Sequence, residues 1–127
     1  MATVTPYVLM YARDNAATAN DGHQDPTEAQ FEAAATAFRM LADPTRLRLM
    51  WQLRQGEHDV ATLTAALGVA RPAVSQHLAK LRLAGLVASR RDGRRVLYRT
   101  RGGHVRAVIA EALSQADHQL ANHPDHD

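Results

Sequence analysis

The stretch Arg71–Gly85, RPAVSQHLAKLRLAG, decides the fold of this 127-residue chain. On a helix, Val74, Leu78 and Leu81 fall on one side, at the i, i+4, i+7 spacing of a buried stripe. The other side carries short polar and basic side chains: Ser75, Gln76 and Lys80. The stretch contains no acid, whereas an ordinary surface helix mixes acids and bases. We therefore expect one side to pack and the other to meet a negatively charged partner.

A second short helix is predicted just before this one. Asp59 can cap it, Gly68 ends it, and its apolar residues are Val60, Leu63 and Leu67. Pro72 suits the opening of the next helix, after a turn of about four residues. Two short helices joined in this way form a helix-turn-helix pattern.

A β-hairpin is predicted after the helix-turn-helix, in LVASRRDGRRVLYRT (86–100). Asp92-Gly93 is a strong two-residue hairpin turn between two strand-like runs. The tip of this hairpin carries four arginines: Arg90, Arg91, Arg94 and Arg95. A hairpin that follows a helix-turn-helix is the wing of a winged helix-turn-helix.

Three further helices complete the predicted architecture. The first is expected to be capped by Asp25, with Pro26 at its first helical position and Glu28 three residues after the cap, and it runs to Leu41. The second opens at Asp43-Pro44 and ends at Gly56. The last, GGHVRAVIAEALSQADHQLANH, has a long apolar face with little domain left to cover it. We therefore expect a mainly α fold with a β-hairpin wing, assembled as a homodimer through this last helix.

The domain boundaries follow from these elements. Residues 1–24 are predicted to be a flexible arm, 25–120 the winged helix-turn-helix and dimerisation domain, and 121–127 a tail rich in histidine and aspartate. The composition also limits the function. The chain has no cysteine, no apolar run long enough to span a membrane and no secretion signal, so we expect a cytoplasmic protein. No catalytic motif stands out, so we expect no enzyme.

Positive charge is concentrated in the predicted second helix of the helix-turn-helix and in the hairpin that follows it. Residues 71–106 hold Lys80 and nine arginines against the single acid Asp92, a net charge of +9, while the rest of the chain carries −7. Such a block favours a polyanion, and here double-stranded DNA. Ser75 and Gln76 are predicted to meet base edges in the major groove. Arg71 and Lys80 are predicted to meet phosphates. The wing arginines Arg90, Arg91, Arg94 and Arg95 are predicted to lie beside the minor groove or the phosphate backbone.

Two blocks of sequence resemble the ArsR/SmtB family of bacterial metal-sensing repressors. They are FRMLADPTRLRLMWQL and SQHLAKLRLAGLVASRRDGRRVLYRT, and the resemblance covers about residues 27–120. It implies a dimeric repressor that binds operator DNA and is released when a metal ion binds. The cysteine pair of the arsenic, cadmium and lead sensors is absent, since Asp59 and Ala61 stand at its positions.

The end of the chain resembles the nickel- and cobalt-sensing branch of the family. Of the four-ligand zinc site of another branch, His104 and His118 are kept, whereas Gly102 and Gln115 replace the other two ligands. The nickel/cobalt pattern instead uses an early histidine, an acid–histidine pair and tail histidines. In this chain it implies the ligands His104, Asp117, His118, His123 and His126.

The spacing of two of these histidines bears on how an ion is held. His104 and His118 lie 14 residues apart, so they share one helix face but are separated by about 21 Å along the axis. They cannot bind one ion from the same helix. An antiparallel pair of last helices would place His104 of one chain beside His118 of the other.

The ligand types, imidazole and carboxylate without sulfur, suit Ni²⁺, Co²⁺ or Zn²⁺ and disfavour Cu(I). The number of candidate ligands, five, exceeds the four of a tetrahedral site and favours octahedral nickel or cobalt. A winged-helix repressor that senses Zn²⁺, or no metal at all, is the alternative. A second alternative is a metal carrier that does not bind DNA specifically.

Overall fold

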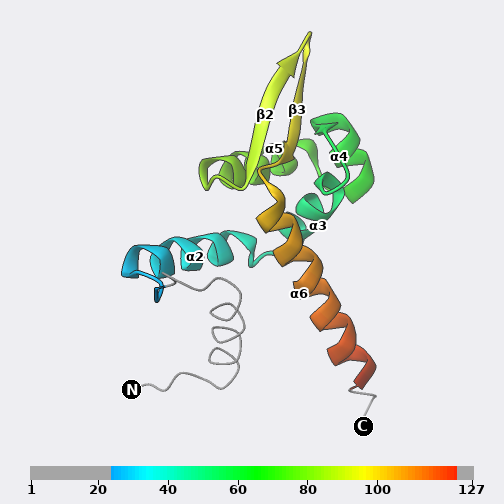
Figure 1. Cartoon of the computed structure of the whole chain (residues 1–127). Coiled ribbons are helices and arrows are strands. Elements are labelled where there is room, and N and C mark those ends of the chain that lie inside the picture. The colour runs from blue at the N-terminus through cyan, green and yellow to red at the C-terminus, as the bar shows by residue number, and fades with distance from the viewer. Residues whose placement is uncertain (1–23, 123–127) are drawn as a thin grey trace. The chain divides into compact units, whose positions relative to one another are not determined.

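The computed structural model describes residues 24–122. In chain order, the structure begins with two helices, α2 (Glu28–Leu41) and α3 (Pro44–Leu53). A short strand, β1 (His58–Asp59), and two further helices, α4 (Val60–Leu67) and α5 (Arg71–Leu83), come next. The hairpin strands β2 (Val87–Asp92) and β3 (Arg95–Thr100) follow, and α6 (Gly103–Asn122) ends the described chain (Figure 1). This order confirms the predicted mainly helical fold with a β-hairpin.

The chain divides into two units, residues 1–32 and 33–127. In the first unit, the described residues contain the start of α2. Thr27 Oγ1 accepts a hydrogen bond from the Gln30 amide at 3.1 Å, and Gln30 Oε1 accepts one from the Thr27 amide at 2.8 Å. This reciprocal pair is a capping box. The prediction that Asp25 caps this helix was wrong, because Thr27, two residues later, is the capping residue and pairs with Gln30.

The second unit is built around the stripe predicted for Arg71–Gly85. Val74, Leu78 and Leu81 of α5 are fully buried. They join a core drawn from α3, α4, β2 and α6, which includes Leu49, Leu53, Leu63, Val87 and Ile109. Burying each leucine side chain contributes about 1.5–3 kcal/mol, so these contacts fix α5 against the rest of the unit.

The helix-turn-helix forms as predicted. Asp59 caps α4 by accepting the amide of Thr62 at 2.8 Å, and Gly68 ends the helix with a φ of 68°, which glycine adopts at no steric cost. Three residues, 68–70, then lead into α5, which has Pro72 in its first turn. Asp43 caps α3 in the same manner, accepting the amide of Arg46 at 2.9 Å.

The wing belongs to a three-stranded antiparallel sheet with the order β1-β3-β2. Asp92 pairs with Arg95, so the two-residue loop is Gly93-Arg94, one residue later than the predicted Asp92-Gly93. Gly93 supplies the positive φ of 66° that this loop needs. The strand β1 was not predicted, because two residues carry no readable periodicity. It pairs His58 with Tyr98 and Asp59 with Leu97.

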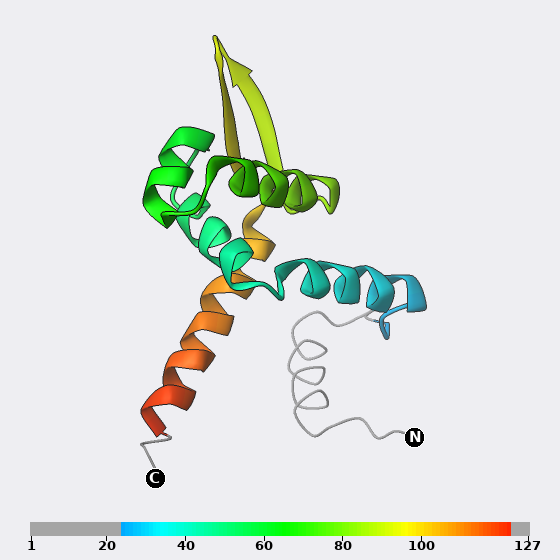
Figure 2. The same ribbon diagram turned by 180° about the vertical axis from the view of Figure 1, so that it is seen from behind.

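The second unit places the wing and α6 on different sides of the helix-turn-helix. Opposite views show the β2–β3 hairpin projecting beyond α4 and α5, while α6 runs away from it (Figures 1 and 2). A buried hydrogen bond joins the base of the wing to α3, where the Thr100 hydroxyl donates to the Leu53 carbonyl at 3.1 Å. Residues 24–122 include no helix with the length and apolarity that crossing a membrane requires.

One part of the predicted apolar face of α6 packs in the core, and the other part is exposed. Ile109 enters the core, and Val105 packs against it. Val108, Leu113 and Leu120 instead stay exposed by 39, 37 and 78%. An apolar groove beside α6 is lined by Phe38, Leu41, Leu47, Val108, Ile109 and Ala112, among others.

Candidate nucleic-acid interface

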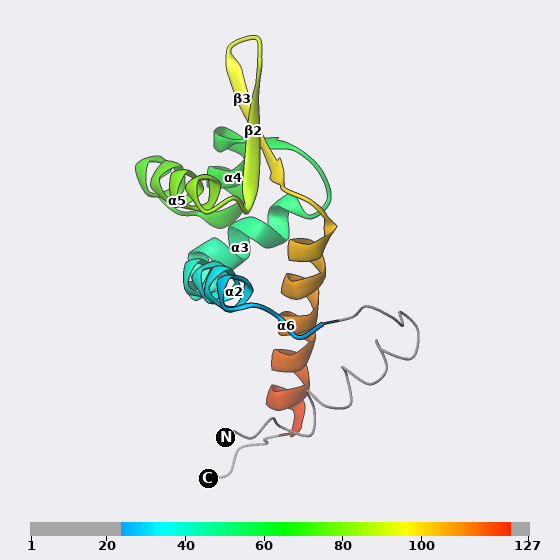
Figure 3. The same cartoon turned by 60° about the vertical axis from the view of Figure 1, so that its left-hand side comes forward.

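The polar side of α5 faces solvent, as the sequence predicts. Ser75, Gln76 and Lys80 are all exposed, and Arg71 is exposed at the start of the helix. Because the apolar stripe of the same helix is held in the core, the direction of these polar side chains is fixed by packing. The α5 helix and the hairpin lie on neighbouring parts of the second unit (Figure 3). They can therefore contact one extended partner.

A polar network fixes the middle of α5 to α3. Nη1 of Arg46 lies 3.2 Å from Nδ1 of His77, and Nε of Arg46 donates to the carbonyl of Met40. The carboxylate of Asp43 accepts the Arg46 amide, and this hydrogen bond, helped by the charge of Arg46, holds the pKa of Asp43 below its usual value. His77 thus makes a hydrogen bond that joins α5 to α3.

One wing arginine is held by an acid at the edge of the sheet. Arg90 donates from Nε and Nη2 to the two carboxylate oxygens of Glu57, each at 2.8 Å. This two-point contact lowers the pKa of Glu57 and raises the pKa of Arg90. Glu57 was not singled out in the sequence, since it lies 33 residues from Arg90 and only the unpredicted strand β1 brings the two together.

A second arginine, Arg95, lies between two acids. Its Nη1 is 3.5 Å from Asp59 and its Nη2 is 3.6 Å from Asp92. Asp59 therefore serves as the α4 cap and as a partner of the wing, and the hydrogen bonds from Thr62, with a smaller effect of Arg95, lower its pKa. The side chains of Arg91 and Arg94 make no hydrogen bond or ion pair with any residue in the described range 24–122.

A hollow of about 230 Å³ lies between the starts of α4 and α5 and the outer half of the wing. We call it the wing hollow. It brings together three of the predicted DNA-binding residues, Arg71, Arg94 and Arg95, against one carboxylate, that of Asp59. Its other lining residues are Val60, Ala61, Val96 and Tyr98. Three arginines lining one hollow suit a phosphate, which a guanidinium group can contact with paired N–H donors.

The predicted metal ligands lie toward the two ends of α6. His104 is exposed in its first turn, and Asp117 and His118 are exposed in its last two turns. His123 and His126 lie outside the described residues. Within residues 24–122 of one chain, no three histidines, aspartates or glutamates gather closely enough to hold an ion. The imidazole and carboxylate donors suit Ni²⁺, Co²⁺ or Zn²⁺ in type, but one described chain does not bring them to one point.

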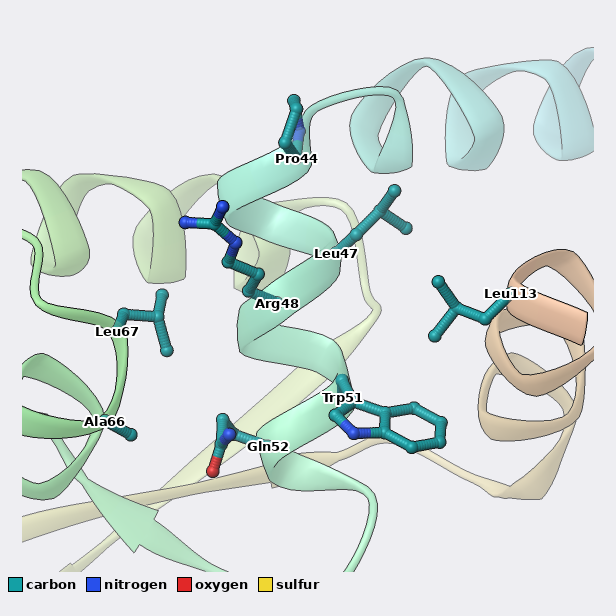
Figure 4. A pocket seen from close by; sticks show the side chains of 8 residues that line it. All are labelled: Pro44, Leu47, Arg48, Trp51, Gln52, Ala66, Leu67 and Leu113. Carbon is teal, nitrogen blue, oxygen red and sulfur yellow. The ribbon is translucent and has the colours of Figure 1, made fainter. Parts of the chain in front are cut away.

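A larger pocket lies away from the wing, between α3, α4 and α6 (Figure 4). It has a volume of about 460 Å³, and its walls are Pro44, Leu47, Arg48, Trp51, Gln52, Ala66, Leu67 and Leu113. Arg54 stacks on Trp51, with its guanidinium carbon 3.5 Å from the ring centroid. None of the predicted DNA-binding or metal-binding residues lines this pocket. The pocket and the groove at Val108 are both lined by α6 and by Leu47 of α3, so they lie along the same face of α6.

Comparisons with known proteins agree with this arrangement. Residues 43–89 match the family described as bacterial regulatory protein, arsR family. The chain is 46% identical over 89 residues to the HTH-type transcriptional regulator KmtR of Mycobacterium tuberculosis, covering 70% of this chain and 68% of that protein. It is 40% identical over 91 residues to the HTH-type transcriptional repressor SmtB of the same species, and this match covers 72% of this chain and 67% of that protein.

A solved structure extends the likeness to the fold. The homodimeric winged helix-turn-helix DNA-binding domain of Mb0332 from Mycobacterium bovis, described as a possible ArsR-family transcriptional regulator, aligns with a TM-score of 0.70 and 33% identity. The alignment covers 84% of this chain and 98% of that domain. These findings confirm the winged helix-turn-helix fold and the resemblance read from the sequence. The chain belongs to the ArsR/SmtB family of DNA-binding transcriptional regulators and is not an enzyme.

Proposed function

We propose that this protein is a dimeric repressor that binds operator DNA in the cytoplasm and is released when Ni²⁺ or Co²⁺ binds between its two α6 helices. The observation that carries the DNA part is the grouping of Arg71, Arg94 and Arg95 around the wing hollow, next to the exposed polar side of α5. In this proposal α5 enters the major groove and a backbone phosphate enters the wing hollow.

The base contacts are assigned to Ser75 and Gln76, and the phosphate contacts to Arg71, Lys80, Arg91, Arg94 and Arg95. The amide of Gln76 can bind an adenine edge through two hydrogen bonds. Lys80, one turn further along α5, is exposed and free to reach a phosphate. The scarcity of acids in 71–106 supports this assignment, because each acid there would face the phosphate backbone.

The partner in the dimer is a second copy of this chain. Phe38, Val108 and Leu113 expose 60, 39 and 37% of their surface around α6, where the two apolar pockets lie. The homodimeric state of the Mb0332 domain supports the same partner. A Val108→Glu substitution is expected to convert the dimer to a monomer in sedimentation velocity, because it places a charge in the apolar groove. Leu83→Glu, at an exposed apolar residue of α5, is the control and leaves the dimer intact.

The ligands that would hold the ion are His104 of one chain with Asp117, His118, His123 and His126 of its partner. The metal supplies a fixed coordination geometry that ties the two α6 helices together. His104 and His118 are exposed at opposite ends of a 20-residue helix. Two antiparallel copies would therefore bring unlike ends together and create two equivalent sites. The resemblance to the nickel/cobalt branch supports the choice of metal.

Release requires that the ion bind the low-affinity arrangement of the dimer more tightly than the DNA-bound one. A dimer reads half-sites about 34 Å apart, so a change in the spacing of the two α5 helices weakens binding. The ion is thus proposed to act on spacing and not on the DNA-contacting side chains.

The experiment is a titration of Ni²⁺, Co²⁺ and Zn²⁺ into the full-length protein bound to its own promoter fragment, followed by fluorescence anisotropy. We expect Ni²⁺ or Co²⁺ to lower the affinity and a chelator to restore it. An effect of Zn²⁺ alone would support the zinc-sensing alternative. An affinity that no ion changes would exclude metal control and leave a repressor without metal. If the promoter fragment is bound no better than random DNA, the repressor assignment itself fails.

A further inference from the structure

We propose that Arg90 is a positioning residue of the wing and not one of its DNA contacts, with Glu57 as its fixed partner. The proposal rests on the DNA-binding function proposed above. It divides the four wing arginines into one that holds the wing in place and three whose side chains are unpaired or make only longer single contacts, and these three can reach the phosphate backbone.

The Arg90–Glu57 pair crosses the central strand of the sheet. Arg90 belongs to β2, Glu57 immediately precedes β1, and β3 lies between these two strands. Arg90 and Asp59 are both directly opposite Leu97 of β3, and directly paired residues share a face. Glu57, two residues before Asp59, lies on this face as well. The ion pair therefore ties both edges of the sheet together over β3.

The residue beneath this link supports a structural role for the pair. Leu97 is only 6% exposed, yet it lies outside the cluster of side chains that forms the main core. Its burial thus depends on what covers this face of the wing. The stems of Arg90 and Glu57 approach each other from the two sides of β3 and can provide that cover, since charged side chains bury their aliphatic parts readily.

The contact geometry separates Arg90 from the other wing arginines. Two of its nitrogens, Nε and Nη2, are engaged by one carboxylate at 2.8 Å each, whereas the contacts of Arg95 are single and longer. Arg91 is adjacent to Arg90 in β2 and so lies on the opposite face, and Arg94 is in the hairpin loop. If Arg90 left Glu57 for a phosphate, an unpaired carboxylate would remain beside the DNA.

The test compares the salt dependence of DNA binding for matched variants of the full-length protein. The probe is a random-sequence 30-base-pair duplex, and fluorescence anisotropy gives the dissociation constant at several KCl concentrations. Each phosphate contact contributes about 0.9 to the slope of log affinity against log salt. The double variant Glu57→Gln/Arg90→Gln keeps the net charge and the side-chain sizes but removes the ion pair.

We expect the double variant to keep the wild-type slope while its affinity falls about 1.4- to fivefold at every salt concentration, the fold-change that matches the contribution of an exposed ion pair. Arg94→Gln is expected to lower the slope by about 0.9 for each wing bound. A slope that falls equally in the double variant would show that Arg90 contacts a phosphate, and an unchanged affinity would show that the pair positions nothing; either result overturns the proposal.

Arg90→Lys provides a second test that does not depend on the double variant being stable. Lysine keeps the charge but cannot form the two-point contact with Glu57. We expect its affinity to fall with the slope retained, whereas a lysine that restores full affinity would indicate a simple charge contact with DNA. Failure of the DNA-binding function would be seen separately, as a wild-type protein with no salt-dependent affinity for the duplex.

Discussion

Arg46 and His77 join three helices at one point, with Arg46 Nη1 3.2 Å from His77 Nδ1. The guanidinium can only donate hydrogen bonds, so Nδ1 of His77 is the acceptor in this contact. Through Nε the same guanidinium binds the Met40 carbonyl at the end of α2, and the Arg46 amide binds Asp43. The orientation of α5 therefore depends on polar contacts as well as on its apolar stripe.

Replacing His77 by phenylalanine should weaken this junction without creating a cavity. The ring remains, but Arg46 loses one acceptor, and we expect the free energy of unfolding in urea to fall by about 0.5–1.5 kcal/mol. Arg46→Met should cost more, because it also removes the bond to the Met40 carbonyl. Equal stability of wild type and His77→Phe would mean that the Arg46–His77 contact contributes nothing to the fold.

The Asp43 cap predicts a pH-dependent stability. Asp43→Ala removes the acceptor for the first turn of α3 and should cost about 1 kcal/mol at pH 7. Because the pKa of Asp43 is lower in the folded chain than in the unfolded one, this contribution is complete above the unfolded pKa and is lost as the pH falls through the folded value.

The measurement is urea unfolding of wild type and Asp43→Ala at a fixed protein concentration between pH 7 and pH 2. The difference between them should be constant down to about pH 5 and shrink below about pH 4. Asp43→Asn keeps an acceptor without a titrating group and serves as the control. A difference that stays constant to pH 2 would contradict the role of the ionised carboxylate.

Two side chains on the exposed side of α5 should have different effects on DNA binding. Gln76→Ala is expected to lower affinity for the promoter fragment by roughly tenfold while leaving random DNA unaffected, because it removes a base contact. Lys80→Ala should weaken both and reduce the salt slope by about 0.9 for each helix bound.

Leu83→Ala is the matched control for these two variants, since Leu83 is exposed on the same helix and has no hydrogen-bonding group. Both affinities are measured by anisotropy at several salt concentrations. Equal losses on promoter and random DNA for Gln76→Ala would argue against a base contact at this position.

The sequence was sufficient to predict the parts of the fold that local signals control. The stripe of Val74, Leu78 and Leu81, the caps Asp43 and Asp59 and the left-handed Gly68 all lie where the pattern placed them. Each depends on neighbours within a few residues or on burial of an apolar face. The start of α2 was misplaced because Asp25 and Thr27 are both acceptable caps, each followed three residues later by a Glu or a Gln, and the structure forms the Thr27–Gln30 pair.

The parts that were not predicted depend on contacts between distant residues. Glu57 and Arg90 meet only because β1 pairs with β3, and a two-residue strand leaves no pattern in the sequence. The hairpin loop moved by one residue for a similar reason, since Asp92 remains in the ladder opposite Arg95 and lies 3.6 Å from its guanidinium. A list of wing arginines from the sequence therefore cannot separate those that are paired within the protein from those that are free.

The proposed sharing of each metal site between two chains can be tested by counting ions. His104 and His118 lie about 21 Å apart along α6, so an ion that needs both must take them from different chains. A mixed dimer of one His104→Ala chain and one His118→Ala chain would then combine both alanines in one site and both histidines in the other. Differently tagged chains, co-expressed and purified through both tags, provide this dimer.

Calorimetric titration of the metal-free proteins with Ni²⁺ measures the stoichiometry. We expect two ions per wild-type dimer, none at high affinity in either homodimeric variant, and one in the mixed dimer, because only one of its two sites keeps both imidazoles. His58→Ala, which removes a histidine from β1 far along the chain from α6, should still bind two. A mixed dimer that binds none would place each site within a single chain, and homodimeric variants that still bind two would remove these histidines from the ligand set.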